Sequence, residues 1–339
     1  MTDLDWRPDI LGAAYSQLAI ELGPDPDGEG TAKAVLVRRE PRMDEPEEAR
    51  GVVLYVHGFT DYFFQAELAD FFAARRFRFY ALDLRKSGRA RQPGQSAHYV
   101  SDLALYDAEL DRALEIVTAA HPGAPVILVA HSTGGLIVPL WLDRVRGSRP
   151  EQAARVAAVV LNSPWLEPQD GILRALVARL LRVLAKAWPL HYLGLKGVYG
   201  HTLHVSGVGE WTYDVLLKPL GGFPARFGWL NAVRRGHSRL HRGIETGVPT
   251  LVLRSTRSRL ATGYSPASDR ADIVLDTRDI GRSAPRLGSR VTDLPIADAR
   301  HDVFLSLPEV RAAAYAALDG WLADQGLTEP STSKQGRGY

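Results

Sequence analysis

Short apolar runs rich in β-branched residues recur along the chain, and segments with helical periodicity separate them. Such runs are typical of strands in a parallel sheet that is covered on both faces. We predict strands at 32–39, 51–57, 77–83, 125–131, 155–163, 249–255 and 290–296, and the run at 11–20 is a candidate for an eighth. The pattern predicts helices at 61–76, 101–120, 135–145 and 307–323. Alternating strands and helices indicate βαβ units, and therefore an α/β fold with helices on both faces of a mostly parallel eight-stranded sheet.

One long segment, 164–247, breaks this alternation. It has no clear strand pattern, and it holds Trp165, Trp188, Trp211 and Trp229 of the seven tryptophans. We interpret it as a helical cap inserted between two strands. This interpretation divides the protein into a core of 1–163 and 248–325, the cap at 164–247, and a polar, disordered tail at 326–339.

The stretch 171–188 within this segment is amphipathic. Four basic residues fall on one face and five apolar residues on the other, namely Arg174, Arg179, Arg182 and Lys186 against Leu173, Leu176, Val177, Leu180 and Leu184. We expect the apolar face to pack on the protein itself. A lid that touches a lipid surface is the alternative, so membrane contact is open but not expected.

Composition removes several classes of function. The chain of 339 residues has no cysteine, which excludes disulfides, thiol nucleophiles and thiolate metal sites. Its net charge of +2 without a basic block gives no reason to expect nucleic acid as a partner. The sequence has no signal-peptide pattern and no apolar run of about 20 residues, so we expect a cytoplasmic protein.

Motifs for cofactors are weak or missing. The stretch GVGEW at 207–211 lacks the third glycine and the preceding strand of a dinucleotide site, and no P-loop pattern occurs. His237 and His241 are four residues apart, but no glutamate lies beside the first histidine as in H-E-x-x-H zinc sites, and we set them aside together with His201 and His204. We therefore expect neither a metal nor a cofactor.

The stretch Ile127–Val138, ILVAHSTGGLIV, places Ser132 between a predicted strand and a predicted helix. Ala130 and Gly134, two residues before and after the serine, are small. A sharp turn that lifts a nucleophilic hydroxyl from the backbone requires small residues at these positions, as in the nucleophile elbow G-x-S-x-G. The stretch therefore predicts that Ser132 is a nucleophile.

A nucleophilic serine needs a base and an oxyanion hole. His301 follows the strand at 290–296, so it should lie at the carboxyl edge of the sheet, where Ser132 also lies. The sequence His57-Gly58-Phe59 follows another strand, and its glycine permits a turn that points the Phe59 amide outwards. We predict that the amides of Phe59 and Thr133 form the oxyanion hole.

These residues resemble the α/β-hydrolases, and specifically the branch of monoacylglycerol-lipase-like and serine-aminopeptidase-like proteins. The blocks HGFTDY, YALDLRKSGRA, HSTGG and HDVFLSLPEV carry the resemblance, which spans roughly residues 50–325. Lys86 and Ser87 depart from it, since the family often has Gly and His there.

The resemblance also suggests the acid of the triad. The family's A-D-x-x-x-D-S-like block is similar to residues 271–277, which makes Asp272 the first candidate. Asp276 is the runner-up and Asp269 a distant third, because an apparent insertion at 256–270 separates the block from its strand. The chain order Ser, Asp, His is that of α/β-hydrolases.

The resulting hypothesis is a serine hydrolase that cleaves a carboxylic ester or a monoacylglycerol through Ser132, His301 and Asp272. Trp165 and Trp211 are candidates for lining an apolar acyl pocket. An amidase or peptidase of the serine-aminopeptidase type is the alternative within enzymes, and a non-catalytic binding protein on the same fold is the alternative outside them. The oligomeric state stays open.

Overall fold

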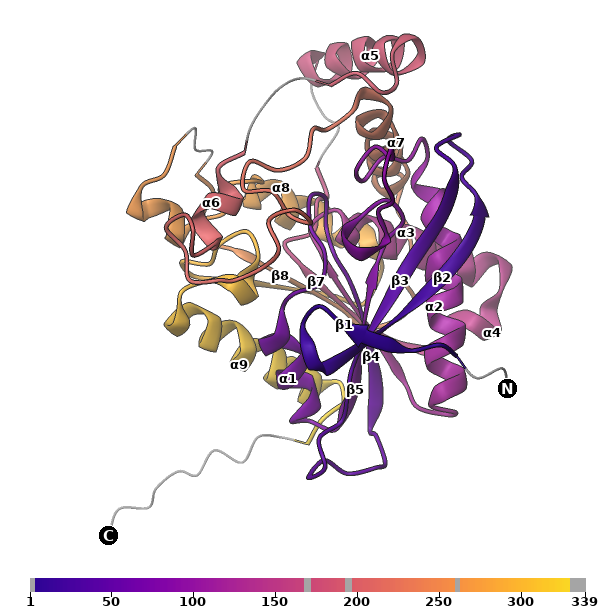
Figure 1. The fold of residues 1–339 in the computed structure, drawn as a ribbon. Coiled ribbons are helices and arrows are strands. Elements are labelled where there is room, and N and C mark those ends of the chain that lie inside the picture. Colours follow the sequence, from indigo (N-terminus) through magenta and orange to yellow (C-terminus); the bar gives the residue numbers. More distant parts are fainter. Residues whose placement is uncertain (1–3, 168–171, 193–196, 260–262, 330–339) are drawn as a thin grey trace.

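A single mixed sheet runs through the protein in this computed structural model, which describes residues 4–167, 172–192, 197–259 and 263–329. Nine strands are present within these ranges, in the order β1-β2-β3-β5-β4-β6-β7-β8-β9. Their bounds are β1 Arg7–Asp9, β2 Gly12–Pro24, β3 Thr31–Arg39, β4 Gly51–Val56, β5 Phe77–Asp83, β6 Val126–His131, β7 Val156–Asn162, β8 Thr250–Ser255 and β9 Val291–Ile296. The pairs from β5 to β9 are parallel, whereas β1, β2 and β3 form an antiparallel edge (Figure 1).

Helices cover the two faces of this sheet. Those of the core are α1 Ala66–Ala73, α2 Asp107–Ala120, α3 Gly134–Ser148, α4 Pro150–Ala153, α8 Thr277–Ser283 and α9 Pro308–Asp324. Side chains of α2 and α3 pack in one buried cluster, and those of α1 and α9 in another. Strand β4 separates the clusters, because Val52 and Leu54 point into the first while Val53 and Tyr55 point into the second. A strand buried on both faces is a continuous apolar run, which is why these strands could be located from the sequence.

The fold confirms the expected α/β class but corrects two of its details. The sheet has nine strands rather than eight, since β1 has three residues and is too short to leave a periodic pattern. Helix α1 begins at Ala66, not at residue 61. Residues 61–65 instead form a buried loop, which is fixed by contacts such as the hydrogen bond from the Phe63 amide to the carboxylate of Asp83.

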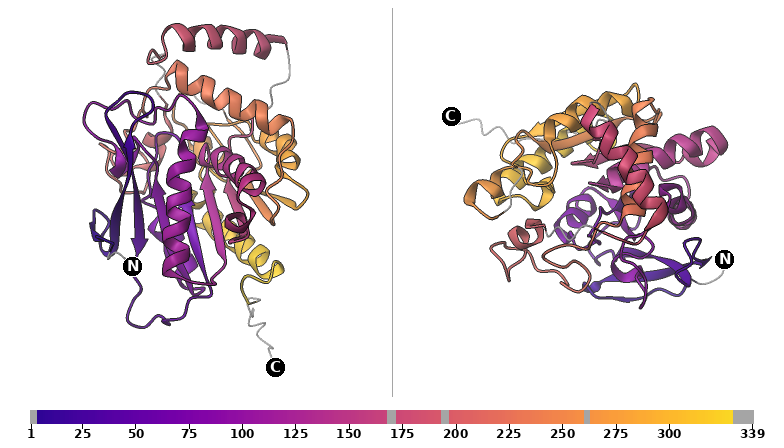
Figure 2. Two further views of the ribbon diagram at one scale, coloured as in Figure 1. Left: turned by 90° about the vertical axis from the view of Figure 1, so that its right-hand side faces the viewer. Right: turned by 90° about the horizontal axis from the view of Figure 1, so that it is seen from above.

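Between β7 and β8 the chain contains α5 Ile172–Ala187, α6 Tyr199–Leu203 and α7 Phe227–His241. Helix α7 packs on the core through buried side chains such as Trp229 and Val233. Helix α5 lies across the outer side of α7, away from the sheet (Figure 2). The structure describes no strand within the parts of the 164–247 segment that it covers.

The packing of α5 differs from the sequence expectation. Only Ala185 is buried on its described turns, whereas Leu176, Val177, Leu180 and Val183 are each at least 56% exposed. Leu184 is half-buried, and the side chains of 172–175, Leu173 among them, lie outside the described residues, as does the tail from 330 onwards. Most of the predicted apolar face therefore points outwards. No helix in the described parts of the chain is long and apolar enough to cross a membrane.

Candidate active site

Ser132 stands at the turn between β6 and α3, as the small residues around it predicted. Its φ of +52° lies in the left-handed region, which is costly for a serine and typical of a strained functional turn. A Cβ on Gly134 would lie 2.5 Å from the carbonyl oxygen of His57, and one on Gly58 would lie 2.8 Å from the Ser132 Cβ. Glycine is therefore required at both positions, because any larger side chain would clash where the elbow contacts the loop that follows β4.

The structure brings His301 and Asp272 to this serine. The Ser132 Oγ lies 2.9 Å from Nε2 of His301, and Nδ1 of the same ring lies 2.9 Å from Oδ2 of Asp272. Since a carboxylate can only accept, Nδ1 carries the hydrogen and Nε2 is free to accept the serine proton. All three side chains are at least nine-tenths buried, which strengthens these contacts by excluding water.

Asp272 contacts His301 although the insertion at 256–270 separates it from β8 in the sequence. The chain leaves β8, and Ser258 then pairs with Asp272 in an isolated parallel bridge, so the two residues lie side by side although they are far apart in the sequence. The second carboxylate oxygen of Asp272 accepts from the amides of Val274 and Leu275, both at 2.8 Å. These two bonds hold the carboxylate with its other oxygen towards His301.

The other two acid candidates lie elsewhere. Asp276 caps the N-terminus of α8 and bonds Arg278, which is the first cause of the lowering of the Asp276 pKa. Asp269 pairs with the buried Arg300 at 2.7 Å, so it braces the residue before His301 rather than its ring.

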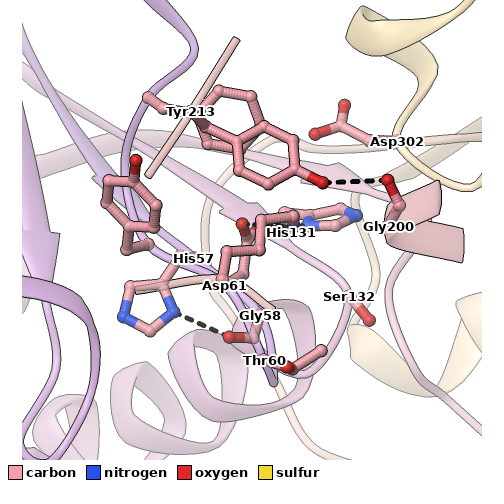
Figure 3. A network of polar contacts seen from close by, with 12 residues as sticks. His57, Gly58, Thr60, Asp61, His131, Ser132, Gly200, Tyr213 and Asp302 are labelled. Atoms are coloured by element: carbon pink, nitrogen blue, oxygen red, sulfur yellow. Dashed lines mark hydrogen bonds and ion pairs between the residues drawn. The ribbon is translucent and has the colours of Figure 1, made fainter. Parts of the chain in front are cut away.

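The loop after β4 carries the predicted oxyanion amide of Phe59. The Leu84 amide donates to Nε2 of His57 at 3.0 Å, so Nδ1 of that ring carries the hydrogen and donates to the Gly58 carbonyl at 2.7 Å (Figure 3). The carbonyl of Gly58 and the amide of Phe59 belong to one rigid, planar trans peptide group, and within its plane they point in opposite directions. Fixing the first therefore orients the second. Sequence reasoning used His57 only as a strand end and missed this contact.

The two tryptophans chosen as pocket residues have different surroundings. The Trp165 amide donates to the Ser132 carbonyl at 2.9 Å, and its ring lies 6.0 Å from that of Trp229, which stacks on Phe59 at 4.0 Å. Trp211 instead donates its indole N–H to the Leu305 carbonyl at 3.1 Å and lies under Arg311. The contacts of Trp165 support an apolar surface beside the nucleophile, and those of Trp211 give no support to a substrate role.

A second buried carboxylate–histidine pair lies beside the triad. Nδ1 of His131 lies 3.2 Å from Oδ2 of Asp61 (Figure 3). The ring centroids of His131 and His301 are 5.0 Å apart. The other oxygen of Asp61 binds Nζ of Lys218 at 2.6 Å. Burial would raise the pKa of Asp61, but the Lys218 ammonium and the His131 ring outweigh burial and lower that pKa below its ordinary value.

Asp302, next to His301 in the chain, is also buried and bonded. Its carboxylate accepts from the Asn162 side chain at 2.6 Å, and its amide donates to the Tyr199 hydroxyl at 2.9 Å. Burial, followed by the charge of Asp302, raises the pKa of Tyr199 well above its ordinary value, so this phenol stays protonated. Lys218 and Tyr199 lie in no motif that the sequence analysis used, and Asp61 lies in the HGFTDY block but was given no role there.

Among the residues that the structure describes, no group of three or more histidine, aspartate or glutamate side chains is arranged to hold a metal ion. His237, which was weighed as a ligand, faces the Trp165 carbonyl at 2.8 Å instead.

Comparison with known proteins identifies the family of the chain. The family model described as serine aminopeptidase, S33, matches residues 47–263. The chain is 32% identical over 143 residues to a monoacylglycerol lipase of Mycolicibacterium smegmatis. The match covers 42% of this chain and 47% of that relative, so it spans less than half of the relative's length.

Solved structures show the same fold at low identity. A soluble variant of the Saccharomyces cerevisiae monoglyceride lipase has a TM-score of 0.62 at 18% identity, with 90% of this chain and 94% of that chain covered. The monoacylglycerol lipase of Paleococcus ferrophilus has 0.59 at 19%, with 91% and 99% covered. A carboxyl esterase of Bacillus coagulans has 0.63 at 12%, with 92% and 98% covered. The chain thus has the α/β-hydrolase fold and belongs to the family described as serine aminopeptidase, S33.

Proposed function

We propose that the protein is a serine hydrolase that cleaves carboxylic esters of the monoacylglycerol type through a Ser132–His301–Asp272 triad. The observation that carries the proposal is the continuous line of contacts from Asp272 through His301 to Ser132, 2.9 Å at each step. A buried nucleophile, a base in the right tautomer and a carboxylate that holds the base are the parts that acyl transfer requires.

The reaction follows from these contacts. Ser132 Oγ attacks the substrate carbonyl carbon while Nε2 of His301 accepts its proton, and Asp272 stabilises the imidazolium. The amides of Phe59 and Thr133 bind the negative oxygen of the tetrahedral intermediate. His301 then returns the proton to the leaving alcohol, which departs and leaves an acyl-serine. Water, activated by the same histidine, hydrolyses the acyl-serine and regenerates the enzyme.

Two observations favour an ester with an apolar acyl group over a peptide with a free N-terminus. The rings of Phe59, Trp165 and Trp229 form an apolar group beside the nucleophile. A free α-ammonium group needs a carboxylate partner, yet Asp61 and Asp302 near the triad are already bonded to Lys218 and Asn162. The lipase name of the Mycolicibacterium smegmatis relative points in the same direction.

The test is a panel of 4-nitrophenyl esters of increasing acyl length, a monoacylglycerol, and aminoacyl anilides, with Ser132→Ala as the blank. We expect the esters and the monoacylglycerol to be cleaved and the anilides to be poor substrates. Faster cleavage of the anilides would move the proposal to the peptidase alternative. Turnover of no substrate, with the acyl esters bound, would favour the non-catalytic alternative.

The exposed face of α5 favours a second function, action at a lipid surface. Leu176, Leu180 and Val183 point into solvent, and the basic Arg179 and Arg182 are exposed on the same helix. Such a face suits the interface of an anionic bilayer. Co-sedimentation with vesicles containing phosphatidylglycerol should deplete the protein from the supernatant, and Leu176→Ser/Leu180→Ser should abolish this. Binding that is equal for both proteins, or none for either, would remove the second function.

A further inference from the structure

A buried ion pair joins the loop after β4 to the 164–247 segment. Lys218 and Asp61 are at most 5% exposed at their side chains, and they meet at 2.6 Å. The Lys218 ammonium also lies between 5.4 and 5.9 Å from the ring centroids of Phe64, Tyr199 and Tyr213. A buried ion pair is weak evidence for stability, because desolvation opposes its attraction. We therefore look for a role of this ion pair in the chemistry of the neighbouring triad rather than in stability.

A single side chain, the ring of His131, lies between the Lys218–Asp61 pair and the proposed base His301. Asp61 accepts from Nδ1 of His131, the residue before Ser132, and the His131 ring lies 5.0 Å from that of His301. Nε2 of His131 is buried and has no hydrogen-bond partner in the described parts of the chain. The charge at Asp61 therefore acts on the base through a histidine that is free to gain a proton.

Proton uptake at this histidine would oppose the reaction. During acyl transfer His301 becomes an imidazolium, and a second imidazolium at 5.0 Å would repel it. An Asp61 carboxylate without a cation would draw a proton onto His131. If His131 stayed neutral, the unbalanced negative charge would instead hold a proton on His301. The first change makes His301 a weaker base, and the second leaves it protonated before the reaction begins, so both lower activity.

We propose that Lys218 is a positioning residue for the base: it balances Asp61, keeps His131 uncharged beside His301, and so leaves His301 free to accept the proton of Ser132. The proposal rests on the hydrolase function proposed above. It assigns to the 164–247 segment a chemical contribution to the site through one side chain, in addition to any contact with substrate.

Each of the other charged or titratable groups around the two histidines is hydrogen-bonded, ion-paired or uncharged. Asp272 binds His301 and two amides, Asp302 binds Asn162, and Arg300 binds Asp269. Tyr199, which packs edge-on against His301, is protonated, as are Tyr55 and Tyr213, whose pKa values burial raises; the His57 ring has both nitrogens occupied. Lys218 is thus the cation whose loss leaves a carboxylate next to His131 without its counter-charge.

The test compares pH profiles of kcat/KM for an ester in the wild type, Lys218→Met, Lys218→Arg and the double variant Asp61→Asn/Lys218→Met. In Lys218→Met we expect the acid limb to move to higher pH by roughly one to three units. The double variant removes both charges and should return the limb to the wild-type position, and Lys218→Arg should keep it. A limb that does not move in Lys218→Met, or that the double variant does not restore, would overturn the proposal.

Histidine ring NMR of the wild type gives a second readout that does not depend on whether Lys218→Met folds. We expect the His131 signals, assigned by their loss in His131→Gln, to remain those of a neutral ring at every pH where the ester is cleaved. A charged His131 ring at the pH of highest activity would contradict the proposal even if Lys218→Met failed to fold. Absence of any esterase activity in the wild type would defeat the hydrolase function instead, while the NMR result would still report on Lys218.

Discussion

Two carboxylate–histidine pairs lie side by side in this protein and have opposite surroundings. Asp272 and His301 end on the hydroxyl of Ser132, and backbone amides hold the free oxygen of the carboxylate. Asp61 and His131 end on a nitrogen without a partner in the described parts of the chain, and an ammonium holds the free oxygen of the carboxylate. Residue types and burial are the same, so the groups at the two ends decide what each pair can do.

The difference concerns where charge is allowed to form. Amides are dipoles, so they fix the orientation of Asp272 without cancelling its charge, and that charge stays available to a forming imidazolium. The Lys218 ammonium cancels the charge of Asp61 and leaves it little attraction for a proton on its histidine. In the proposed mechanism, His301 accepts a proton during each turnover, whereas His131 remains neutral throughout.

The largest expected effect separates the pairs by rate. Asp272→Asn should lower kcat by about 10⁴-fold with the fold intact, because the amide no longer enforces the His301 tautomer. Asp276→Asn is the matched control: asparagine caps a helix as well as aspartate does, so this variant should leave both stability and kcat nearly unchanged. Steady-state kinetics with circular dichroism measures both, and a larger loss in Asp276→Asn would reverse the assignment of the acid.

The second largest effect concerns the free energy of unfolding, to which the ion pair of Asp61 should contribute. Asp61→Asn leaves the Lys218 ammonium buried without its counter-charge and should cost about 3–5 kcal/mol of unfolding free energy in urea. Because the pKa of Asp61 is lowered on folding, its contribution is present above its unfolded pKa of about 3.9 and is lost as the pH falls. The gap between wild type and variant should therefore shrink below about pH 4. A gap that widened there would contradict the ion pair.

The smallest effect tests the elbow on which both histidines depend. Gly134→Ala would place a Cβ 2.5 Å from the His57 carbonyl and should cost about 1–3 kcal/mol, together with a fall in kcat. Gly147→Ala in the same helix meets no heavy atom within 4 Å and should gain about 0.5–1 kcal/mol. Thermal unfolding of the pair gives the comparison, and equal shifts would mean that the elbow tolerates a methyl group.

The sequence allowed prediction of the parts that local pattern determines. Buried strands leave apolar runs, and Ser132 and His301 lie where such runs end, so both could be located from spacing alone. Asp272 required the family resemblance, because the insertion before it hides its relation to β8. Lys218 and Asp61 are 157 residues apart and meet only through the tertiary fold, so no periodicity marks them. The outward face of α5 could not be foreseen either, since its pattern is the same whether it packs on protein or faces solvent.

Reaction with a fluorophosphonate probe tests the central claim most directly, because the probe modifies only a serine that a neighbouring base activates. Peptide mapping of the folded protein should find one adduct, on Ser132, formed much more slowly in His301→Gln and absent in Ser132→Ala. No adduct on the folded wild type, or an adduct on another serine, would contradict the account.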